Sequence, residues 1–344
     1  MITTTARQTP ATRGSVAWVG VGSGIATNAE AVLHWGMCEG VPVIAVRDLR
    51  MRYGDNDVLT GVDFDVYPGE VLCLLGPNGA GKTTTIEILE GFRIRSSGQV
   101  TVLGMDPAWA DEQWRARTGV VLQSWRDHPR WTPRGLLTQL GGYYAPYSTP
   151  DRVRPHEAEL LLEAVGLTAL ADRKIATLSG GQRRRLDVAI GIVGRPEVLF
   201  LDEPTAGFDP QARREFHQLV RRLADWEHTT IVLTTHDLDE AEKLADRVLI
   251  LAGGRIVADD SADTLARRVS GDAEISWSRN GERFAVSAAD ATAYVRELLA
   301  RHDDIRDLEV RRASLEDAYL ALVRQHEAGH AEAAVRLFTR EVAG

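Results

Sequence analysis

A chain of 344 residues, 44% of them hydrophobic and 26% charged, can hold one large folded domain and a smaller one. Its formal net charge of −9 excludes proteins that hold nucleic acids through a broadly basic surface, so we expect no nucleic-acid partner. The two cysteines, Cys38 and Cys73, supply neither a disulfide framework nor a metal-ligand set, and no apolar run approaches the roughly 18–20 residues of a membrane helix.

Residues 1–40 show neither helical nor strand periodicity, and we predict an N-terminal extension without stable structure. Within it, residues 20–24 (Gly-Val-Gly-Ser-Gly) superficially match a dinucleotide-binding loop, but no strand precedes them and no helix follows. The apolar run over residues 16–25 is short and glycine-rich for the core of a signal peptide, which stays the weaker alternative.

Strands are expected next over residues 43–53 and 62–67, because their partial alternation is typical of a half-solvated antiparallel sheet. An unbroken apolar run over residues 71–75 predicts a strand that is buried on both faces. Residues 84–89 then predict a helix that ends at Gly91.

Between this buried strand and the helix, residues 76–83 read Gly-Pro-Asn-Gly-Ala-Gly-Lys-Thr and match the phosphate-binding P-loop. Its glycines allow successive backbone N–H groups to turn toward a phosphate, and the helix N-terminus adds partial positive charge. We expect Lys82 to reach the β- and γ-phosphates of a nucleotide and the Thr83 hydroxyl to bind Mg²⁺. The predicted phosphate-binding residues are Gly76, Asn78, Gly79, Gly81, Lys82, Thr83 and Thr84.

Residues 119–123 predict a strand that closes on Gln123, and residues 124–180 are mostly helical in pattern, with one clear helix over residues 157–165. The start of this segment, residues 124–131, is rich in aromatic and basic side chains, which are common anchors of protein interfaces.

Residues 178–182 read Leu-Ser-Gly-Gly-Gln, and we expect them at a helix N-terminus, where the Ser179 hydroxyl and backbone N–H groups can bind a phosphate. The arginines that follow, Arg183, Arg184 and Arg185, predict a solvated or ion-paired helix face rather than a nucleic-acid patch.

Two further buried strands end in polar side chains. Residues 198–203 end in Asp202 and Glu203, and residues 229–235 lead to His236. Because neighbours on a strand point to opposite faces, the two carboxylates are expected to differ in role. We expect Asp202 to bind Mg²⁺ and Glu203 to orient or deprotonate an attacking water.

The P-loop, the Leu-Ser-Gly-Gly-Gln signature and the strand ending in Asp202-Glu203 resemble, in order and spacing, the ATPase subunit of ABC transporters over residues 43–260. The resemblance implies an α/β fold: a P-loop NTPase core, an antiparallel β subdomain, and a helical subdomain (about residues 124–180) that presents the signature. It also implies ATP and Mg²⁺ as cofactors, a second cassette bound head to tail, a separate transmembrane permease, and a peripheral place on the cytoplasmic face of the membrane.

The resemblance also implies roles for single residues. Tyr53 would stack on adenine, although a strand-end aromatic can simply pack on its sheet. Gln123 would approach Mg²⁺ or the attacking water, and His236 would hold the γ-phosphate and that water. Residues 207–209 match the D-loop, where the family usually carries Leu at the position of Phe208. The remaining implied nucleotide contacts are Ser179, Gly180, Gly181, Gln182 and Asp209.

After the ATPase domain (residues 41–260), we predict a small α/β accessory domain over residues 261–325 and a helical tail over 326–344. Ser-Leu-Glu-Asp-Ala-Tyr-Leu over residues 314–320 resembles drug-resistance-type exporter ATPases. This ending implies efflux of a small molecule, drug or lipid and disfavours an importer. A soluble ABC ATPase outside transport is the other alternative, disfavoured because one P-loop stands here without tandem cassettes or a zinc insertion.

The tail contains one misleading pattern. His326-Glu327-Ala328-Gly329-His330 matches the H-E-x-x-H pattern of zinc proteases. A third ligand is needed, but only Glu332 and Glu341 follow, and a glycine interrupts the ligand helix. We therefore expect a solvated terminal helix and no zinc.

Overall fold

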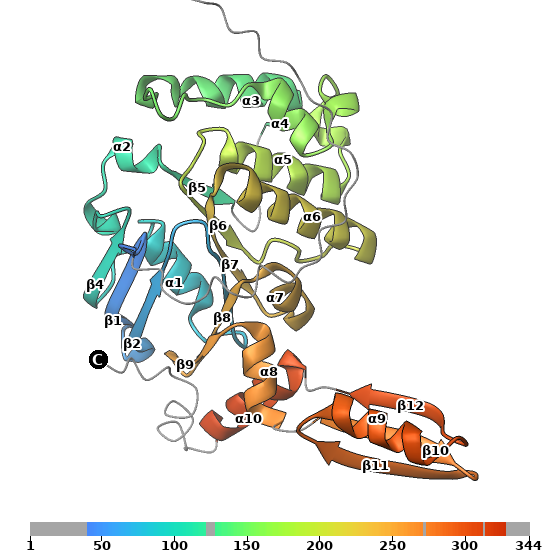
Figure 1. Ribbon diagram of the computed structural model, residues 1–344. Coiled ribbons are helices and arrows are strands. Elements are labelled where there is room, and N and C mark those ends of the chain that lie inside the picture. Colours follow the sequence, from blue (N-terminus) through green and yellow to red (C-terminus); the bar gives the residue numbers. More distant parts are fainter. Residues whose placement is uncertain (1–39, 122–127, 271–272, 312–313, 328–344) are drawn as a thin grey trace, which may run out of the picture. The chain divides into compact units, whose positions relative to one another are not determined.

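The computed structural model describes residues 40–121, 128–270, 273–311 and 314–327 (Figure 1). All that follows concerns the compact unit that begins at Val41. The predicted N-terminal extension, apart from Gly40, and the tail from residue 328 lie outside the described residues.

A six-stranded sheet with the order β5-β6-β7-β3-β8-β9 forms the centre of the molecule. Its strands are parallel neighbours except for the last, which runs antiparallel to β8. They are β5 (Thr118–Val121), β6 (Val198–Asp202), β7 (Thr230–Thr235), β3 (Val71–Leu75), β8 (Arg247–Ala252) and β9 (Arg255–Asp260).

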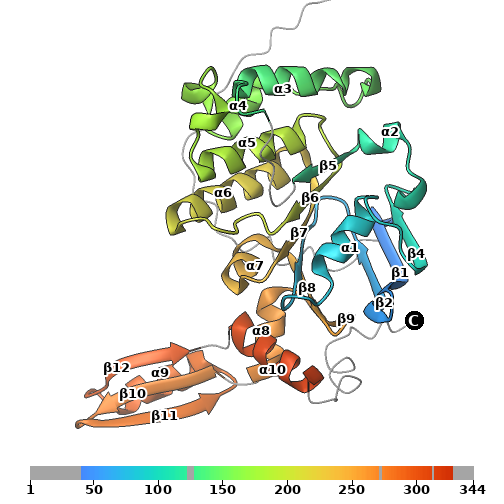
Figure 2. The same cartoon turned by 180° about the vertical axis from the view of Figure 1, so that it is seen from behind.

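Strand β3 shows why this sheet is buried on both faces. All five of its residues are buried, as the unbroken apolar run predicted. Val71, Cys73 and Leu75 join one hydrophobic cluster, whereas Leu72 and Leu74 join another, because side chains alternate across a sheet. Figures 1 and 2 show helices α5–α7 on one side of the sheet, and α1 with a smaller sheet on the other.

The smaller sheet is antiparallel, with the order β2-β1-β4. Its strands are β1 (Ile44–Tyr53), β2 (Asn56–Val66) and β4 (Ser97–Val102). The first two confirm the expected pair, although β2 begins six residues earlier than its alternation indicated. Register shifts between β1 and β2 interrupt the alternation on which the prediction depended. Helix α1 (Lys82–Leu89) and α2 (Glu112–Arg115) pack into the same cluster through Ile86 and Trp114.

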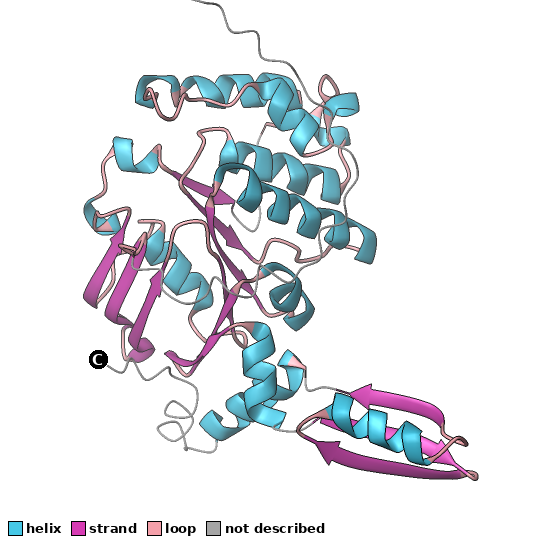
Figure 3. Cartoon of the chain, in the orientation of Figure 1, coloured by secondary structure: helices cyan, strands magenta, loops and turns pink. Residues whose placement is uncertain are grey.

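Figure 3 shows a group of helices beside the core sheet. They are α3 (Pro133–Gly142), α4 (Ala158–Ala164), α5 (Gly180–Ile192), α6 (Pro210–Glu227) and α7 (Leu238–Leu244), with the short 3-10 turns η3 (Ala145–Tyr147), η4 (Thr168–Leu170) and η5 (Ile175–Thr177). A further 3-10 turn, η2 (Pro107–Trp109), contacts α1 and β4 instead. The helix expected over residues 157–165 is α4, which ends before Gly166 at a φ of 67°. Among the described residues, no helix has the length and apolar character needed to cross a membrane.

The accessory unit in the structure has different boundaries from the predicted domain over residues 261–325. Helices α8 (Ala262–Ser270) and α10 (Leu315–Glu327) pack on each other, and their apolar residues join the cluster under the core sheet. Between them, β10 (Ala273–Arg279), β11 (Glu282–Ala288), α9 (Ala291–Arg301) and β12 (Arg306–Arg311) form a separate unit around Ile275 and Trp277. The accessory fold is therefore an insertion between two helices that pack against the core sheet, since Leu265 and Leu315 are fully buried there.

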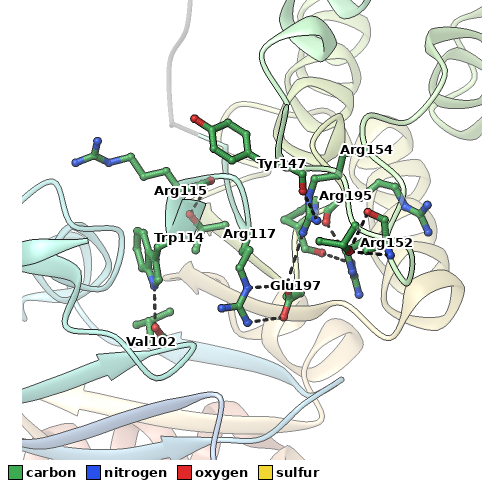
Figure 4. A network of polar contacts seen from close by, with 12 residues as sticks. Val102, Trp114, Arg115, Arg117, Tyr147, Arg152, Arg154, Arg195 and Glu197 are labelled. Carbon is green, nitrogen blue, oxygen red and sulfur yellow. Dashed lines mark hydrogen bonds and ion pairs between the residues drawn. The ribbon is translucent and has the colours of Figure 1, made fainter. Parts of the chain in front are cut away.

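One carboxylate joins three segments at the amino-terminal end of β6 (Figure 4). Arg117, before β5, donates to both oxygens of Glu197 at 2.8 Å. The guanidinium of Arg154, almost wholly buried in the loop before α4, lies 3.6 Å from the same carboxylate. Arg152, in that loop, donates to the carbonyls of Arg195 and Pro196. Glu197 therefore fixes the helical subdomain to the core sheet.

Replacing Glu197 with Gln should lower the free energy of unfolding by about 2 kcal/mol at pH 7, because hydrogen bonds to a charged group are lost. The bonds from Arg117 and the nearby charges hold the pKa of the Glu197 carboxyl below its ordinary value. A depressed folded-state pKa stabilises the fold above the unfolded pKa, about 4.3, and this stabilisation disappears as the pH falls through the folded value. Urea unfolding at pH 7 and pH 3.5 should therefore show a gap in the free energy of unfolding between the variant and the native chain that is smaller at the lower pH. Glu163→Gln, at an exposed position of α4, is the control and should show no gap at either pH.

Candidate functional site

The carboxyl ends of three adjacent strands carry the predicted site residues. Strand β3 leads into the P-loop, β6 ends at Asp202, and β7 leads to His236. These strands are neighbours in the order β6-β7-β3 and run parallel. Parallel strands place their carboxyl ends at one edge, where ligands bind in open α/β sheets. Segments more than a hundred residues apart in the sequence thus meet at one edge.

The P-loop glycines occupy positions that no larger residue fits. Gly79 and Gly81 have φ values of 82° and 105°, in the region that favours glycine. A Cβ on Gly76 would lie 2.3 Å from the carbonyl oxygen of Leu251, and one on Gly81 would lie 2.6 Å from Leu59. Within the described residues, no side chain caps the start of α1 at Gly81. Its first backbone N–H groups can therefore bind an anion.

Lys82 places a buried cation against this loop. Its side chain is 5% exposed, and Nζ donates to the carbonyl oxygens of Gly76 at 2.8 Å and Pro77 at 3.2 Å. Burial lowers the pKa of Lys82, while the charges of Glu203 and Asp202 act in the opposite direction. A cation in this position is stabilised by a bound phosphate, so Lys82 fits the predicted role.

The hydroxyls that follow Lys82 differ in their surroundings. Thr83 and Asn78 are exposed and Thr84 is half-buried, so all three stay available to a ligand. Thr85, which the sequence reading passed over, is fully buried and donates to the carbonyl oxygen of Gly81 at 2.9 Å. This bond holds the first turn of the helix on the loop.

Glu203 and His236 lie in contact. The Nδ1 of His236 is 3.2 Å from Oε1 of Glu203, and Nζ of Lys82 is 3.9 Å from the same oxygen. The Asp202 carboxylate instead accepts a hydrogen bond from the Thr234 hydroxyl. The two carboxylates therefore have different partners, as expected from their adjacency.

Strand alternation alone does not explain that difference. Glu203 has a φ of 41°, outside the extended region, so the strand geometry ends at Asp202. Its backbone N–H donates to the carbonyl oxygen of Thr234 at 3.2 Å and to the Thr234 hydroxyl at 3.1 Å. Residues held in this conformation carry strain and concentrate at functional sites. Glu203 is such a residue.

The signature begins α5 through a capping box. The Ser179 hydroxyl accepts from the backbone N–H of Gln182 at 3.3 Å, and the Gln182 side chain accepts from the backbone N–H of Ser179 at 3.0 Å. Ser179 and Gly180 are exposed at this helix end. In the part of the chain that the structure describes, no hydrogen bond or ion pair joins residues 178–182 to the P-loop. A phosphate contact of the signature stays a prediction.

The arginines after the signature correct one expectation. Arg183 pairs with Asp187 at 3.1 Å, and Arg185 lies 3.8 Å from Glu215, as expected of an ion-paired face. Arg184 is instead 6% exposed and lies in the interior. Local charge pattern does not show which arginine of a run the fold will bury.

Of the D-loop residues, Phe208 packs against the core, whereas Gly207 and Asp209 are exposed. Phe208 packs edge-on against the fully buried Phe216, with ring centroids 5.8 Å apart, so its extra bulk is accommodated there. The carboxylate of Asp209 caps α6, accepting from the backbone N–H groups of Gln211 and Ala212 at 2.9 Å. A nucleotide contact of Asp209 stays a prediction.

Tyr53 is 39% exposed at the end of β1. The guanidinium of Arg93 lies 5.1 Å from its ring centroid and is held by Glu87 at 2.6 Å. One face of the ring thus has a cationic partner, which the sequence reading did not identify. Stacking on adenine stays a prediction for Tyr53.

Gln123 and His330 lie outside the described residues, as does the side chain of His326. Among the residues described, no three His, Cys, Asp or Glu side chains cluster as a metal site would require. Mg²⁺ in nucleotide sites uses one or two protein ligands together with phosphates and water, which the Asp202 carboxylate and Thr83 hydroxyl fit.

Comparisons with known proteins agree with this arrangement. Residues 59–206 match the protein family described as "ABC transporter". The chain is 42% identical to the daunorubicin resistance ATP-binding protein DrrA2 of Streptomyces coeruleorubidus, over 65% of this chain and 68% of that protein. It is 32% identical to the linearmycin resistance ATP-binding protein LnrL of Bacillus subtilis, over 84% and 91% respectively.

It is also 40% identical to a Nod factor export ATP-binding protein I of Ralstonia nicotianae, over 63% of this chain and 66% of that protein. Among solved structures, an ATP-binding cassette of an ABC transporter in its ADP conformation superposes with a TM-score of 0.58. The sequence identity there is 25%, over 68% of this chain and 96% of that one.

Proposed function

This chain belongs to the family of ABC transporter ATP-binding proteins, and from that premise we propose that it hydrolyses ATP to power export of a small molecule, drug or lipid through a separate transmembrane permease. The observation that carries the proposal is that the Glu203 carboxylate lies beside both the P-loop residue Lys82 and the imidazole of His236. Relatives named for daunorubicin resistance, linearmycin resistance and Nod factor export support the direction of transport.

The site residues divide the reaction among them. Lys82 and the N–H groups at the start of α1 neutralise charge on the transferred phosphoryl group, which requires positioning and electrostatic stabilisation above all. Glu203 orients or deprotonates the attacking water. The imidazole of His236, in contact with the Glu203 carboxylate, positions that carboxylate and the water together.

Asp202 and Thr83 would hold Mg²⁺, which supplies charge neutralisation at the phosphates when it is bound. Thr234 donates to the Asp202 carboxylate and fixes its orientation at the end of β6. Asp202 would therefore bind the metal while Glu203 acts on the water, so each carboxylate has a single role.

A second copy of the chain would complete the site. Ser179 and Gly180 are exposed at a helix N-terminus, where backbone N–H groups favour an anion. We infer that they bind the γ-phosphate of ATP held by the partner's P-loop, so that two cassettes bind two ATP molecules head to tail. Binding closes this pair, and hydrolysis followed by product release opens it.

The helical subdomain supplies the surface that we assign to the permease. Trp131 and Tyr143 are 41% and 65% exposed, and the Trp131 ring lies 5.4 Å from that of His128. Aromatic side chains on a surface are common interface anchors. When the cassette pair opens and closes, this surface would transmit the movement to the permease.

The test is purification of the full-length chain from detergent-extracted membranes of its own organism, with Trp131→Ala as the interface variant. We expect one integral membrane protein at fixed stoichiometry with the native chain, less of it with the variant, and ATP-dependent transport once the complex is placed in liposomes. Lys243→Ala, an exposed position on α7, is the matched control. A chain that instead retains ribosomes or a soluble assembly, or a complex that transports without ATP, would contradict the proposal.

A further inference from the structure

Arg184 is the one arginine after the signature that the fold buries, and its guanidinium is directed at backbone. Its Nε donates to the carbonyl oxygen of Pro204 at 2.9 Å, and its Nη2 donates to the carbonyl oxygen of Asp202 at 3.4 Å. The side chain belongs to α5, only five residues beyond Ser179. A buried guanidinium is costly unless it makes specific hydrogen bonds, and these two bonds tie it to the end of β6.

The two carbonyl groups stand on either side of Glu203. That residue has the positive φ of 41° described above, and its N–H is held by Thr234 on β7. The short turn is therefore fixed from two directions, by β7 at the N–H of Glu203 and by α5 at the flanking carbonyls. Unfavourable backbone conformations of this kind persist only where the surrounding structure holds them.

We propose that Arg184 is a positioning residue for Glu203, and that through it the position of the signature helix sets the position of the carboxylate that handles the attacking water. This inference rests on the proposed function. The signature serves the ATP of the partner subunit, whereas Glu203 serves the ATP held by its own P-loop. Arg184 therefore gives the two ATP sites of a cassette pair a direct physical connection through α5.

The first test is Arg184→Met in the full-length chain, which keeps similar length and removes every donor. We expect kcat to fall about 10–100-fold, because small misplacement of a reacting group has effects of this size. The KM for ATP should stay within about twofold, since Lys82 and the P-loop are untouched. Arg184→Lys keeps one cationic donor and should recover part of the rate.

Arg95→Met is the matched control for loss of a part-buried arginine. Arg95 donates to the carbonyl oxygen of Gly98 at 2.9 Å and pairs with Asp106 in the antiparallel subdomain. This variant should lower Tm while kcat stays at the native value. If Arg95→Met lowers kcat as much as Arg184→Met does, the effect is one of stability, and the inference is wrong.

A double-mutant cycle separates positioning from other roles. If Arg184 acts through Glu203, adding Arg184→Met to Glu203→Gln should slow hydrolysis by less than about threefold further, because coupled residues are not additive. Full additivity of the two effects would overturn the inference. So would a native kcat in Arg184→Met, or in Arg184→Lys if the first variant does not fold. Absence of ATP hydrolysis by the native chain would instead refute the proposed function itself.

Discussion

Glu203→Gln is expected to slow ATP hydrolysis by about 10²–10⁴-fold while Mg-ATP still binds, since general-base help of this size is lost when the base cannot accept a proton. The amide keeps the shape of the carboxylate and can still contact His236, which lies 3.2 Å from Oε1 in the native chain. The measurement is phosphate release at saturating ATP, together with titration of a fluorescent ATP analogue to confirm binding.

Glu163→Gln, at an exposed position of α4, provides the same chemical change away from the site and should hydrolyse ATP at the native rate. If Glu203→Gln also keeps that rate, Glu203 has no part in the reaction, and its contact with His236 is structural only.

Lys82→Ala is expected to weaken Mg-ATP binding about 10–100-fold and to abolish measurable turnover. A hydrogen bond to a charged group contributes about 1.5–3 kcal/mol, and each 1.4 kcal/mol is tenfold in affinity. In the native chain the Lys82 side chain is 5% exposed, and its ammonium group donates to the carbonyls of Gly76 and Pro77. Isothermal titration with ATP measures the loss of affinity.

Lys243→Ala removes a different lysine, half-exposed on α7 and paired with Asp239, and should bind ATP as the native chain does. Native ATP affinity and turnover in Lys82→Ala would refute the assignment of residues 76–83 as a phosphate-binding loop.

The elements around the P-loop could be predicted because their patterns are local. An unbroken apolar run gives β3, and a glycine-rich loop that leads into a helix gives α1, so strand, loop and helix were all confirmed. Short alternating runs between turn residues likewise indicated a small α/β accessory domain, and its strands and helix are β10, β11, α9 and β12. Helix α8 was missed, and α10 was assigned to the wrong unit, because burial of Leu265 and Leu315 depends on distant partners.

Other features depend on how strands are ordered. Glu203 and His236 are 33 residues apart, and they touch because β6 and β7 are parallel neighbours with Asp202 opposite Thr234. The sequence pattern within either strand does not show how β6 and β7 are aligned with each other. The burial of Arg184 and the partner of Tyr53 likewise come from segments that meet only in the folded chain. Sequence identified the chemistry of the candidate site, whereas tertiary structure decided which groups act on one another.

The central claim is that two cassettes bind ATP between P-loop and signature, and light scattering of Glu203→Gln measures it most directly. With Mg-ATP the variant should elute as a dimer, and without nucleotide as a monomer. Adding Ser179→Arg should abolish the dimer, because a bulky side chain would occupy the place of the partner's γ-phosphate. Thr132→Arg removes the cap of α3 in the same way and should leave the dimer intact. A Glu203→Gln chain that stays monomeric at saturating Mg-ATP, or a dimer indifferent to Ser179→Arg, would contradict the account.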